Sequence, residues 1–490
     1  MSYVLTRRAA MLTALAAASP AIARAPSSSE RPLPRGSRPK PPTGDSIVRA
    51  AGLTGVVGFV VADTATGEVL DAMSPDLALP PASTMKAITS LYALNTLGSD
   101  WRFRTAIIAT GPVEDGIVKG DIALMGSGDP TMDTDRMLTL AKALAGRGIK
   151  GVSGRFLTWD GVLPEVARIA EGQPEQVGYN PAISGLNLNF NRVHFSWKRN
   201  GTGYDIDVQA RGKRASPDAS RTASVGVSDR KGPVYQYGGN TNGRDNWTVA
   251  KGALGKEGSR WLPVREPEIY VGDIFRTLAQ GQGVRLPRAV EADEMPQGAT
   301  LVSVAGRTLA DVLRGMMKYS TNLTAEVVGM TASRMSGGPY PGLPASALRM
   351  THWARQNFGV ENALFVDHSG LGYGSGVSAS DMVRLLSADQ AVRPLMKGVN
   401  LALSNSNPAP LGVSAVAKTG TLNFVSTLAG YVSTRSGRDL TFSIMTADVK
   451  RRDAIPTVQR ERPEGGRGWA NRSRSLQKRL IRNWALGLNS

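Results

Sequence analysis

Three short polar motifs, far apart in the sequence, place the strongest constraint on the fold of this chain. They are Ser83-Thr84-Met85-Lys86, Ser320-Thr321-Asn322 and Lys418-Thr419-Gly420, in that order. Ser83 and Ser320 lie 237 residues apart, so a fold that unites the motifs must hold much of the intervening sequence outside their site. The residue types and their order predict a serine nucleophile that is assisted by lysine.

The first motif is weak evidence by itself, because the same Ser-x-x-Lys spacing recurs at Ser37, Ser228 and Ser475. The other two motifs each occur once. What distinguishes Ser83 is its context, since only this serine opens a predicted buried helix downstream of a strand hairpin. We therefore expect Ser83 at a helix start, within reach of the other two motifs.

The bulk composition is that of a large globular protein. A length of 490 residues predicts two or three domains. The formal net charge of +18 favours anionic surroundings, which nucleic acid, an anionic membrane face or an acidic cell-wall polymer would provide, although a solubilising surface bias explains it equally well. The sequence has no zinc knuckle, RNP-like motif or helix-turn-helix pattern, so we expect no nucleic-acid partner. The absence of cysteine excludes thiol catalysis, cysteine-ligated metal and disulfide bonds.

The N-terminus has the parts of an export signal. Arg7 and Arg8 precede a short apolar stretch, Met11–Ser19, and Ala21-Ile22-Ala23 suits cleavage. We predict a signal over residues 1–23, used by the twin-arginine or the general secretory route, and a Pro-rich linker over 24–47. No segment approaches the ~20 apolar residues that span a membrane.

The rest of the sequence predicts an α+β fold with several domains. Residues 48–100 and 300–490 read as one domain, in which helices flank an antiparallel sheet, and 101–299 read as inserted, β-rich material. The elements predicted for the first domain are Val56–Val61, Val69–Leu70, Ser83–Leu97, Leu309–Met317, Leu323–Met330, Ala415–Ala417, Leu428–Val432 and Leu440–Met445. Those predicted for the insert are strands at Ala106–Ala109, Ile117–Leu124 and Tyr204–Val208 and a helix near Met132–Ala145.

The C-terminal segment predicts an amphipathic helix. Leu476, Leu480, Ile481 and Trp484 fall on one face of it, opposite basic residues. We expect that face to pack on the sheet; association with a membrane surface is the alternative.

The chemistry expected of the motifs begins with the activation of Ser83. On a helix, residues three apart share a face, so the Lys86 amine can contact the Ser83 hydroxyl and act as its base. Lys86 must be neutral to do so, which requires a pKa lowered by burial and by a second cation, for which Lys418 is the candidate. The backbone N–H groups of Ser83 and Thr421 are the expected oxyanion donors.

The other motif residues are expected to bind the substrate and to move protons. Ser320 is expected to carry a proton between Lys86 and the leaving nitrogen, and Asn322 to hold Lys86 and to donate to the substrate amide. Lys418, Thr419 and Thr421 together suit a terminal carboxylate. Gly420 is expected to leave room for a substrate along that strand.

Competing chemistries have less support. The three histidines lack the H-E-x-x-H spacing, and the sequence contains no G-x-S-x-G nucleophile elbow. We interpret His368, beside Ser369, as a loop residue. Gly126-Ser127-Gly128-Asp129-Pro130 lacks the lysine of a phosphate loop and is interpreted as a turn at a strand end.

With these residues placed, the chain from about residue 48 onward resembles the class C low-molecular-mass penicillin-binding proteins, the D-Ala-D-Ala carboxypeptidases and endopeptidases of the S13 peptidase family. The motif spacing is the most specific element, since this family carries inserted domains between its first two motifs. Further similar segments are Gly126–Thr131, Tyr179–Asn191, Ala325-Glu326 and Asp367–Leu371. His368 replaces an expected glycine, which puts the local loop conformation in question, and Thr321 stands where aspartate is common.

The resemblance implies a penicillin-binding, β-lactamase-like transpeptidase fold and a periplasmic enzyme that acts on peptidoglycan stem peptides. Ser83 would be acylated by the penultimate D-alanine, and penicillin would acylate it and leave slowly. No metal or organic cofactor is implied. A serine β-lactamase or esterase, or a non-catalytic wall-binding protein of the same fold, are the alternatives. The absence of an E-x-x-x-N segment between the second and third motifs argues against a β-lactamase.

Overall fold

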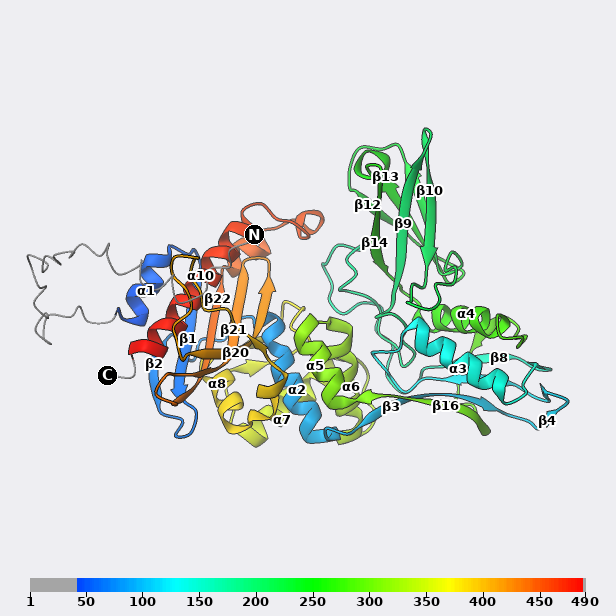
Figure 1. Ribbon diagram of the computed structural model, residues 1–490, viewed down its shortest axis with the longest axis horizontal. Helices are drawn as coiled ribbons and strands as arrows, with labels where there is room; N and C mark the ends of the chain where they lie inside the picture. Colours follow the sequence, from blue (N-terminus) through cyan, green and yellow to red (C-terminus); the bar gives the residue numbers. More distant parts are fainter. Residues whose placement is uncertain (1–41, 488–490) are drawn as a thin grey trace, which may run out of the picture. The chain divides into compact units, whose positions relative to one another are not determined.

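A six-stranded antiparallel sheet lies at the centre of the part of the chain that carries the three motifs (Figure 1). The computed structural model describes residues 42–487, so the predicted export signal lies outside the described residues. The order of the strands is β19-β20-β21-β22-β1-β2. Their bounds are β1 Val56–Asp63, β2 Val69–Met73, β19 Lys397–Gly398, β20 Ser414–Leu422, β21 Val425–Ser433 and β22 Asp439–Ala447. The prediction of one antiparallel sheet is confirmed.

The C-terminal helix α10 (Gly466–Gly487) packs on one face of this sheet, together with α1 (Gly44–Ala51) (Figure 1). The predicted apolar face is buried there against strand residues such as Phe59 and Phe442. The Trp484 indole N–H also donates to Asp71 Oδ2 at 2.8 Å. Packing on the sheet is thus confirmed, and the apolar face is already covered by the chain's own strands.

Helices cover the other face of the sheet. Their bounds are α2 Met85–Leu97, α5 Leu309–Tyr319, α6 Asn322–Gly337, α7 Leu343–Phe358 and α8 Ala379–Ala388. Every residue of α2 from Met85 to Ala93 is buried, because this helix runs through the middle of the layer and packs against α5, α6 and α7. Smaller elements complete this part: η2 Ala82–Thr84, β17 Ala363–Leu364, β18 Gly376–Val377, η4 Gln390–Leu395, α9 Val449–Asp453 and η5 Thr457–Gln459.

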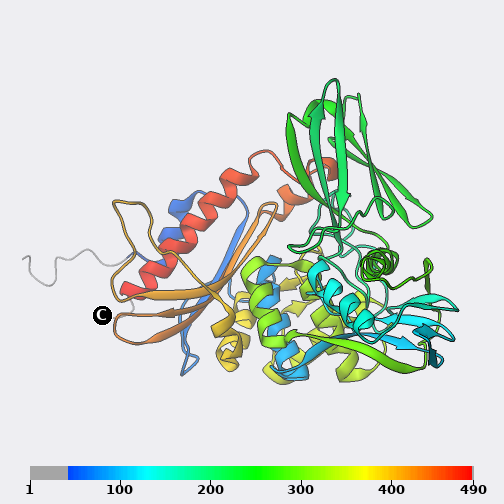
Figure 2. The same ribbon diagram turned by 45° about the vertical axis from the view of Figure 1, so that its right-hand side comes forward.

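The segment between the first two motifs leaves through β3 (Arg102–Ala109) and returns through β16 (Ala299–Thr308), which pair antiparallel (Figure 2). These two strands belong to a five-stranded sheet, β15-β8-β6-β3-β16, which is packed with α3 (Thr134–Gly146) and α4 (Pro267–Gln280). The remaining strands of this sheet are β6 Ile122–Met125, β8 Phe156–Trp159 and β15 Ala289–Glu291. Because β3 and β16 are paired, the segment between the first two motifs begins and ends at neighbouring positions.

Three small sheets make the rest of this segment β-rich, as expected. They contain β4 Val113–Glu114, β5 Ile117–Val118 and β7 Gly151–Val152; β9 Arg192–Asn200, β10 Gly203–Gln209 and β14 Glu257–Pro263; and β11 Ala223–Ser228, β12 Tyr235–Thr241 and β13 Arg244–Ala250, followed by η3 Lys251–Ala253. The helix predicted near Met132–Ala145 is α3, whereas α4 was not predicted. The domain boundaries themselves stay predictions.

Two predictions of local structure are wrong. The run Ile117–Leu124 is not one strand: β5 and β6 belong to different sheets, and a turn at Lys119–Asp121 separates them. The predicted linker over 24–47 extends too far, because α1 begins at Gly44. The Thr43 hydroxyl caps that helix by accepting from the Ser46 N–H, and Ile47 is buried under the sheet.

Candidate active site

Ser83 lies in the short 3₁₀ turn that leads into α2, at the helix start where it was expected. The turn is fixed from both sides, because the hydroxyls of Thr84 and Thr427 both donate to the Pro81 carbonyl, at 2.6 and 2.7 Å. Ala82, the residue before the serine, has a left-handed backbone with φ of 46°, a conformation that costs about 1–3 kcal/mol. The turn therefore holds a half-buried serine on a strained backbone.

Lys86 is the centre of the site. Its Nζ is fully buried and donates to Ser83 Oγ at 3.0 Å, to Asn322 Oδ1 at 2.8 Å and to the Ser369 carbonyl at 2.8 Å. Burial lowers the pKa of Lys86 to about 8, against the opposing effect of the Glu326 and Asp367 carboxylates. The sequence placed this amine correctly against Ser83 and Asn322, and burial acts on its pKa as expected.

Lys418 approaches from β20, but its predicted electrostatic role needs correction. Its Nζ donates to Ser320 Oγ at 3.0 Å and to the Thr419 carbonyl at 2.7 Å. Burial, and then repulsion from Lys86 and Lys397, lowers the pKa of Lys418 to about 7. Burial, not Lys418, is thus the cause of the lowered Lys86 pKa, because Lys418 is the first of the two amines to lose its proton as the pH rises.

Ser320 and Asn322 stand at the junction of two helices. Ser320 ends α5 with a left-handed φ of 58°, and its N–H donates to the Met316 carbonyl at 2.7 Å. Asn322 is the first residue of α6. Its Oδ1 accepts from Lys86, while its Nδ2 donates to the Tyr179 carbonyl at 2.9 Å, from the segment between the first two motifs. This contact of Asn322 was not predicted: the amide donor expected to bind substrate also holds that segment.

The end of β20 forms one wall of the site. β19 pairs with β20 only at Ala417 and Val416, so residues 418–422 have no described strand on their outer edge. Thr419 and Thr421 are exposed there, and Thr421 lines the cavity. An edge of this kind can pair with an extended peptide.

Gly420 was expected to leave room for a substrate, but the structure shows that it is needed for contacts within the protein. A Cβ at this position would lie 2.1 Å from Thr427 Oγ1, 2.8 Å from the Pro81 carbonyl oxygen and 2.9 Å from the Ser83 nitrogen. The missing side chain therefore lets β20 approach the Ser83 turn itself.

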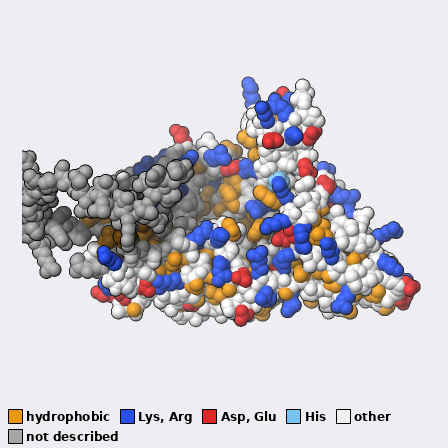
Figure 3. Space-filling model, viewed as in Figure 1, with side chains coloured by type: hydrophobic (Ala, Val, Ile, Leu, Met, Phe, Trp, Pro, Cys, Tyr) orange, Lys and Arg blue, Asp and Glu red, His pale blue; other side chains and the backbone are white. Residues whose placement is uncertain are grey.

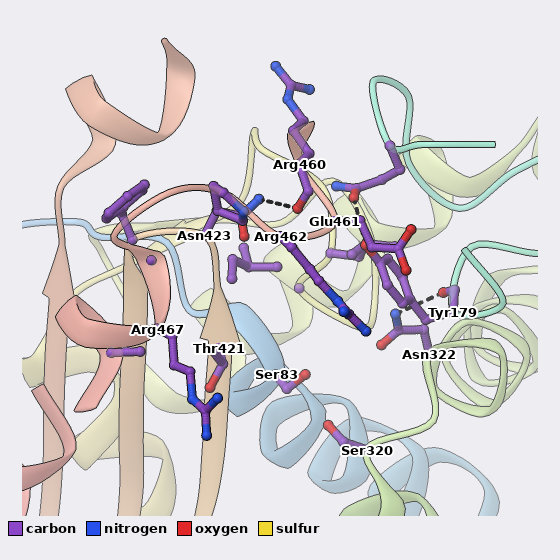
Figure 4. Close-up of a pocket in the computed structure, with 18 of the residues that line it drawn as sticks. Ser83, Tyr179, Ser320, Asn322, Thr421, Asn423, Arg460, Glu461, Arg462 and Arg467 are labelled. Carbon is purple, nitrogen blue, oxygen red and sulfur yellow. Dashed lines mark hydrogen bonds between the residues drawn. The ribbon is translucent and has the colours of Figure 1, made fainter. Parts of the chain in front are cut away.

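The site opens into a cavity of about 780 Å³, shown in Figure 4. Ser83, Ser320, Asn322 and Thr421 line it, with Tyr179 on one side. The segment before α10 and the first turns of α10 supply a basic wall, formed by Arg460, Arg462, Arg467 and Arg474. Within the described chain, the guanidinium groups of Arg462 and Arg467 make no hydrogen bond or ion pair with another residue, so they can bind an anion in the cavity.

The loop Asp367–Leu371, to which the sequence analysis assigned no role, helps to position Lys86 through the Ser369 carbonyl. Glu326 accepts hydrogen bonds from the His368 and Ser369 N–H groups at 2.8 and 2.9 Å. Asp367 accepts from the Gly370 and Gly372 N–H groups at 2.8 and 2.5 Å. Together these carboxylates aim the Ser369 carbonyl at Lys86. The segments Ala325-Glu326 and Asp367–Leu371 were noted from the sequence, but nothing in them signalled this contact.

His368 does not belong to the reacting groups. Its ring is fully buried, with Nε2 2.8 Å from Ser346 Oγ and Nδ1 3.4 Å from Met350 Sδ. Burial lowers the pKa of His368 to about 3, so the ring is neutral. The loop keeps a defined conformation around this histidine, which packs against Gly329, where a Cβ would lie 2.2 Å from the ring. Its interpretation as a loop residue outside any triad fits this placement.

The sheet with helices on both faces and the serine at the start of a central helix define the penicillin-binding fold. The D-Ala-D-Ala carboxypeptidase 3 (S13) family matches residues 45–462, and the chain belongs to this family. It is thus a D-Ala-D-Ala carboxypeptidase of the serine peptidase class, a hydrolase. The resemblance predicted from the motifs is confirmed.

Relatives in sequence agree with this assignment, and a solved structure shares the fold. The chain is 30% identical to a D-alanyl-D-alanine carboxypeptidase of Actinomadura sp. (strain R39) over 477 residues, 86% of each chain. It is 24% identical to the D-alanyl-D-alanine carboxypeptidase DacB of Haemophilus influenzae, over 83% of this chain and 89% of that one. The crystal structure of penicillin binding protein 4 (dacB) from H. influenzae superimposes with a TM-score of 0.73 at 17% identity, over 89% of this chain and 99% of that one. Among residues 42–487, no helix combines the length and apolar character that crossing a bilayer requires.

Proposed function

We propose that the chain cleaves D-Ala-D-Ala stem peptides of peptidoglycan through an acyl-enzyme on Ser83. The observation that carries the proposal is the contact of the buried, partly neutral Lys86 amine with the Ser83 hydroxyl at 3.0 Å. Neutral Lys86 takes the hydroxyl proton while Ser83 Oγ bonds to the carbonyl carbon of the penultimate D-alanine. The N–H groups of Ser83 and Thr421 stabilise the oxyanion.

Collapse of the tetrahedral intermediate breaks the bond to the terminal D-alanine. The leaving nitrogen takes the proton from Lys86 through Ser320, which is hydrogen-bonded to Lys418 on the other side. Water then attacks the ester carbonyl, gives a proton to Lys86 and restores the Ser83 hydroxyl. When the leaving amine belongs to a neighbouring stem, the same steps cleave a cross-link, so we include endopeptidase activity.

The substrate is expected to lie along the free edge of β20. Its terminal carboxylate faces Lys418, Thr419 and Thr421, and other anionic groups of the stem face the basic wall of the cavity. Figure 3 shows Lys and Arg side chains spread over the face of the molecule in that view rather than gathered in one patch. Among the described residues on that face, the basic side chains form no single track of the kind that binds a nucleic acid.

The β-lactams are proposed as covalent inhibitors of Ser83. The H. influenzae structure complexed with a novel β-lactam has the same fold, with a TM-score of 0.68 at 18% identity. The proposed place of action is the periplasm, reached through the predicted export signal. A peripheral contact with the membrane through basic residues of α10 remains part of the proposal, since its polar face carries several exposed arginines.

Labelled penicillin tests the acyl-enzyme. Wild-type protein and a Ser228→Ala control, which alters a serine of the same Ser-x-x-Lys spacing, should form a covalent adduct, whereas Ser83→Ala should not. Equal labelling of Ser83→Ala would refute the assignment. Rapid turnover of penicillin without an adduct would favour a β-lactamase, and intact motifs without release of D-alanine from a pentapeptide would favour a wall-binding protein.

Incubation with purified cell wall distinguishes the two peptidase activities. Release of free D-alanine indicates carboxypeptidase action, and conversion of cross-linked dimers to monomers, measured by mass, indicates endopeptidase action. Arg462→Ala should raise KM for the pentapeptide by about 10-fold with little change in kcat, because a lost anion contact removes binding shared by substrate and transition state. The exposed Arg479→Ala on α10 is the control.

A further inference from the structure

Several carboxylates converge at one end of the five-stranded sheet, away from the Ser83 cavity. Asp160 directly follows β8, and Glu291 ends β15, the parallel neighbour of β8. Glu268 lies in the first turn of α4, and Glu165 lies in the loop that follows β8. One carboxylate oxygen from each of Asp160, Glu165 and Glu268 lies within 4.8 Å of the other two.

Glu268 has no partner that would explain its burial. Its side chain is 5% exposed, and within residues 42–487 its carboxylate has no hydrogen bond or ion pair with any other residue. Asp160 is also 5% exposed and accepts only the Ser184 hydroxyl, at 2.5 Å, and nearby N–H groups. A buried, uncompensated carboxylate is costly, since burial and repulsion both oppose its charge. These two effects raise the pKa of Glu268 to about 8.

The chain had ample means to compensate these charges with its own side chains. It has 58 lysine and arginine residues against 40 aspartate and glutamate residues. In the described part, no lysine or arginine forms an ion pair with Asp160, Glu165 or Glu268. The buried Glu268 carboxylate is instead directed at two other carboxylates. A cation from solution would compensate these charges.

We propose that Asp160, Glu165 and Glu268 bind a hard divalent cation, Ca²⁺ or Mg²⁺. The ligand atoms are all carboxylate oxygens, which these ions prefer, whereas Zn²⁺ sites use histidine or cysteine as well. Calcium binds oxygen at about 2.3–2.6 Å, so oxygens on opposite sides of one ion are about 4.6–5.2 Å apart. The spacing of the three oxygens fits around one such ion.

The position of the site suggests what the ion does. Asp160 and Ser184 are hydrogen-bonded and close the base of the segment 161–183. This segment carries Tyr179, whose carbonyl accepts from Asn322 in the Ser83 site. An ion shared by Asp160, Glu165 and Glu268 fixes that segment to α4. The proposal does not depend on the acyl-enzyme chemistry, because ion binding is measured without substrate.

The test is ion binding by the full chain after treatment with EDTA. Calorimetric titration with CaCl₂ and MgCl₂ should show one ion per chain, and Tb³⁺ luminescence excited through tryptophan should appear, because Trp159 precedes Asp160. Glu268→Gln and the exposed Glu165→Gln should each weaken binding at least ~10-fold. The exposed Glu257→Gln on β14 should bind like wild type, and ZnCl₂ should not compete at equal concentration.

A second measurement reports on the segment itself. Bound Ca²⁺ should raise the midpoint of thermal unfolding and slow proteolysis within 161–183 in the wild type and in Glu257→Gln, but not in Glu165→Gln. No binding at millimolar Ca²⁺ or Mg²⁺ in the wild type, or undiminished binding in Glu165→Gln, would overturn the proposal. Glu165 is exposed, so its variant decides the outcome even where Glu268→Gln fails to fold.

Discussion

Replacement of Glu326 by glutamine should shift the pH dependence of acylation to lower pH. The Glu326 carboxylate is buried in α6 and accepts from the Ser369 N–H, while the Ser369 carbonyl accepts from Lys86. Its negative charge raises the pKa of Lys86 and so opposes the effect of burial. Without that charge, Lys86 should lose its proton at lower pH and should act as a base there.

The size of the shift follows from the hydrogen-bond path. Hydrogen bonds of 2.8 and 2.9 Å join the amine and the carboxylate through Ser369, and we take ~6 Å as their separation for the calculation. Two unit charges at ~6 Å with an effective dielectric constant of ~20 interact by about 2.8 kcal/mol, which is about 2 pKa units. Burial and Asp367 raise the pKa of Glu326 to about 8, so its carboxylate is only partly charged near that pH, and the rising limb of the acylation rate should move from about pH 8 to lower pH by at most about 2 units. Stability should also fall by about 1–3 kcal/mol, because glutamine has one oxygen to accept two N–H groups.

The measurement is the second-order rate of labelling by penicillin between about pH 5 and pH 10. The exposed Glu361→Gln serves as a matched control and should keep the wild-type limb. An unchanged limb in Glu326→Gln would refute the reasoning. It would mean that Glu326 is already neutral, a state favoured by burial and by Asp367, which raise its own pKa to about 8.

Three further predictions concern the supports of the site and the fold. Gly420→Ala should abolish most acylation and lower stability by about 1–3 kcal/mol, because its Cβ would press on Thr427 and the Ser83 turn; labelling and urea unfolding measure both. Trp484→Ala should lower the free energy of unfolding by about 3–5 kcal/mol, since the buried indole joins α10 to Phe59 and Asp71; a change under about 1 kcal/mol would contradict this packing. In EDTA, the free energy of unfolding should fall as the pH rises from about 4.5 to about 8, because folded Glu268 still holds a proton that the unfolded chain has lost; Ca²⁺ should reduce this fall.

The parts of the site that the sequence predicted are those encoded in local spacing and residue type. Ser83 and Lys86 are one helical turn apart, so their contact follows from helix geometry once the helix start is recognised. Ser320 and Asn322 were expected between two helices, and the structure places them at that junction, with Asn322 as the first residue of α6. The Ser369 carbonyl and the Glu326 carboxylate were missed, because a carbonyl has no sequence signature and a buried glutamate in a helix is indistinguishable from an exposed one without the tertiary fold.

The inserted segment was predicted less well for a related reason. Its short strands belong to several sheets, and the choice of partner strand depends on distant residues, as for β5 and β6. Asp160 and Glu268 meet only because α4 packs against β8 and β15 of the five-stranded sheet. The sequence analysis considered the positive charge only as a property of the whole chain, whereas Arg462 before α10 and Arg467 in its first turn line the cavity.

The lowered pKa values of Lys418 and Lys86 together predict that the bound substrate helps Lys86 to lose its proton. In the free protein Lys418 loses its proton at about pH 7 and Lys86 at about pH 8. Between these two pH values, Lys86 is therefore the amine that still carries a positive charge. A substrate carboxylate beside Lys418 should raise the pKa of Lys418, and the restored cation should then push the proton off Lys86 by repulsion. Penicillin should therefore acylate Ser83 with a rising limb at lower pH than its methyl ester, which lacks that charge. Stopped-flow labelling with the pair measures this difference, and coincident limbs would show that Lys86 loses its proton without help from the substrate.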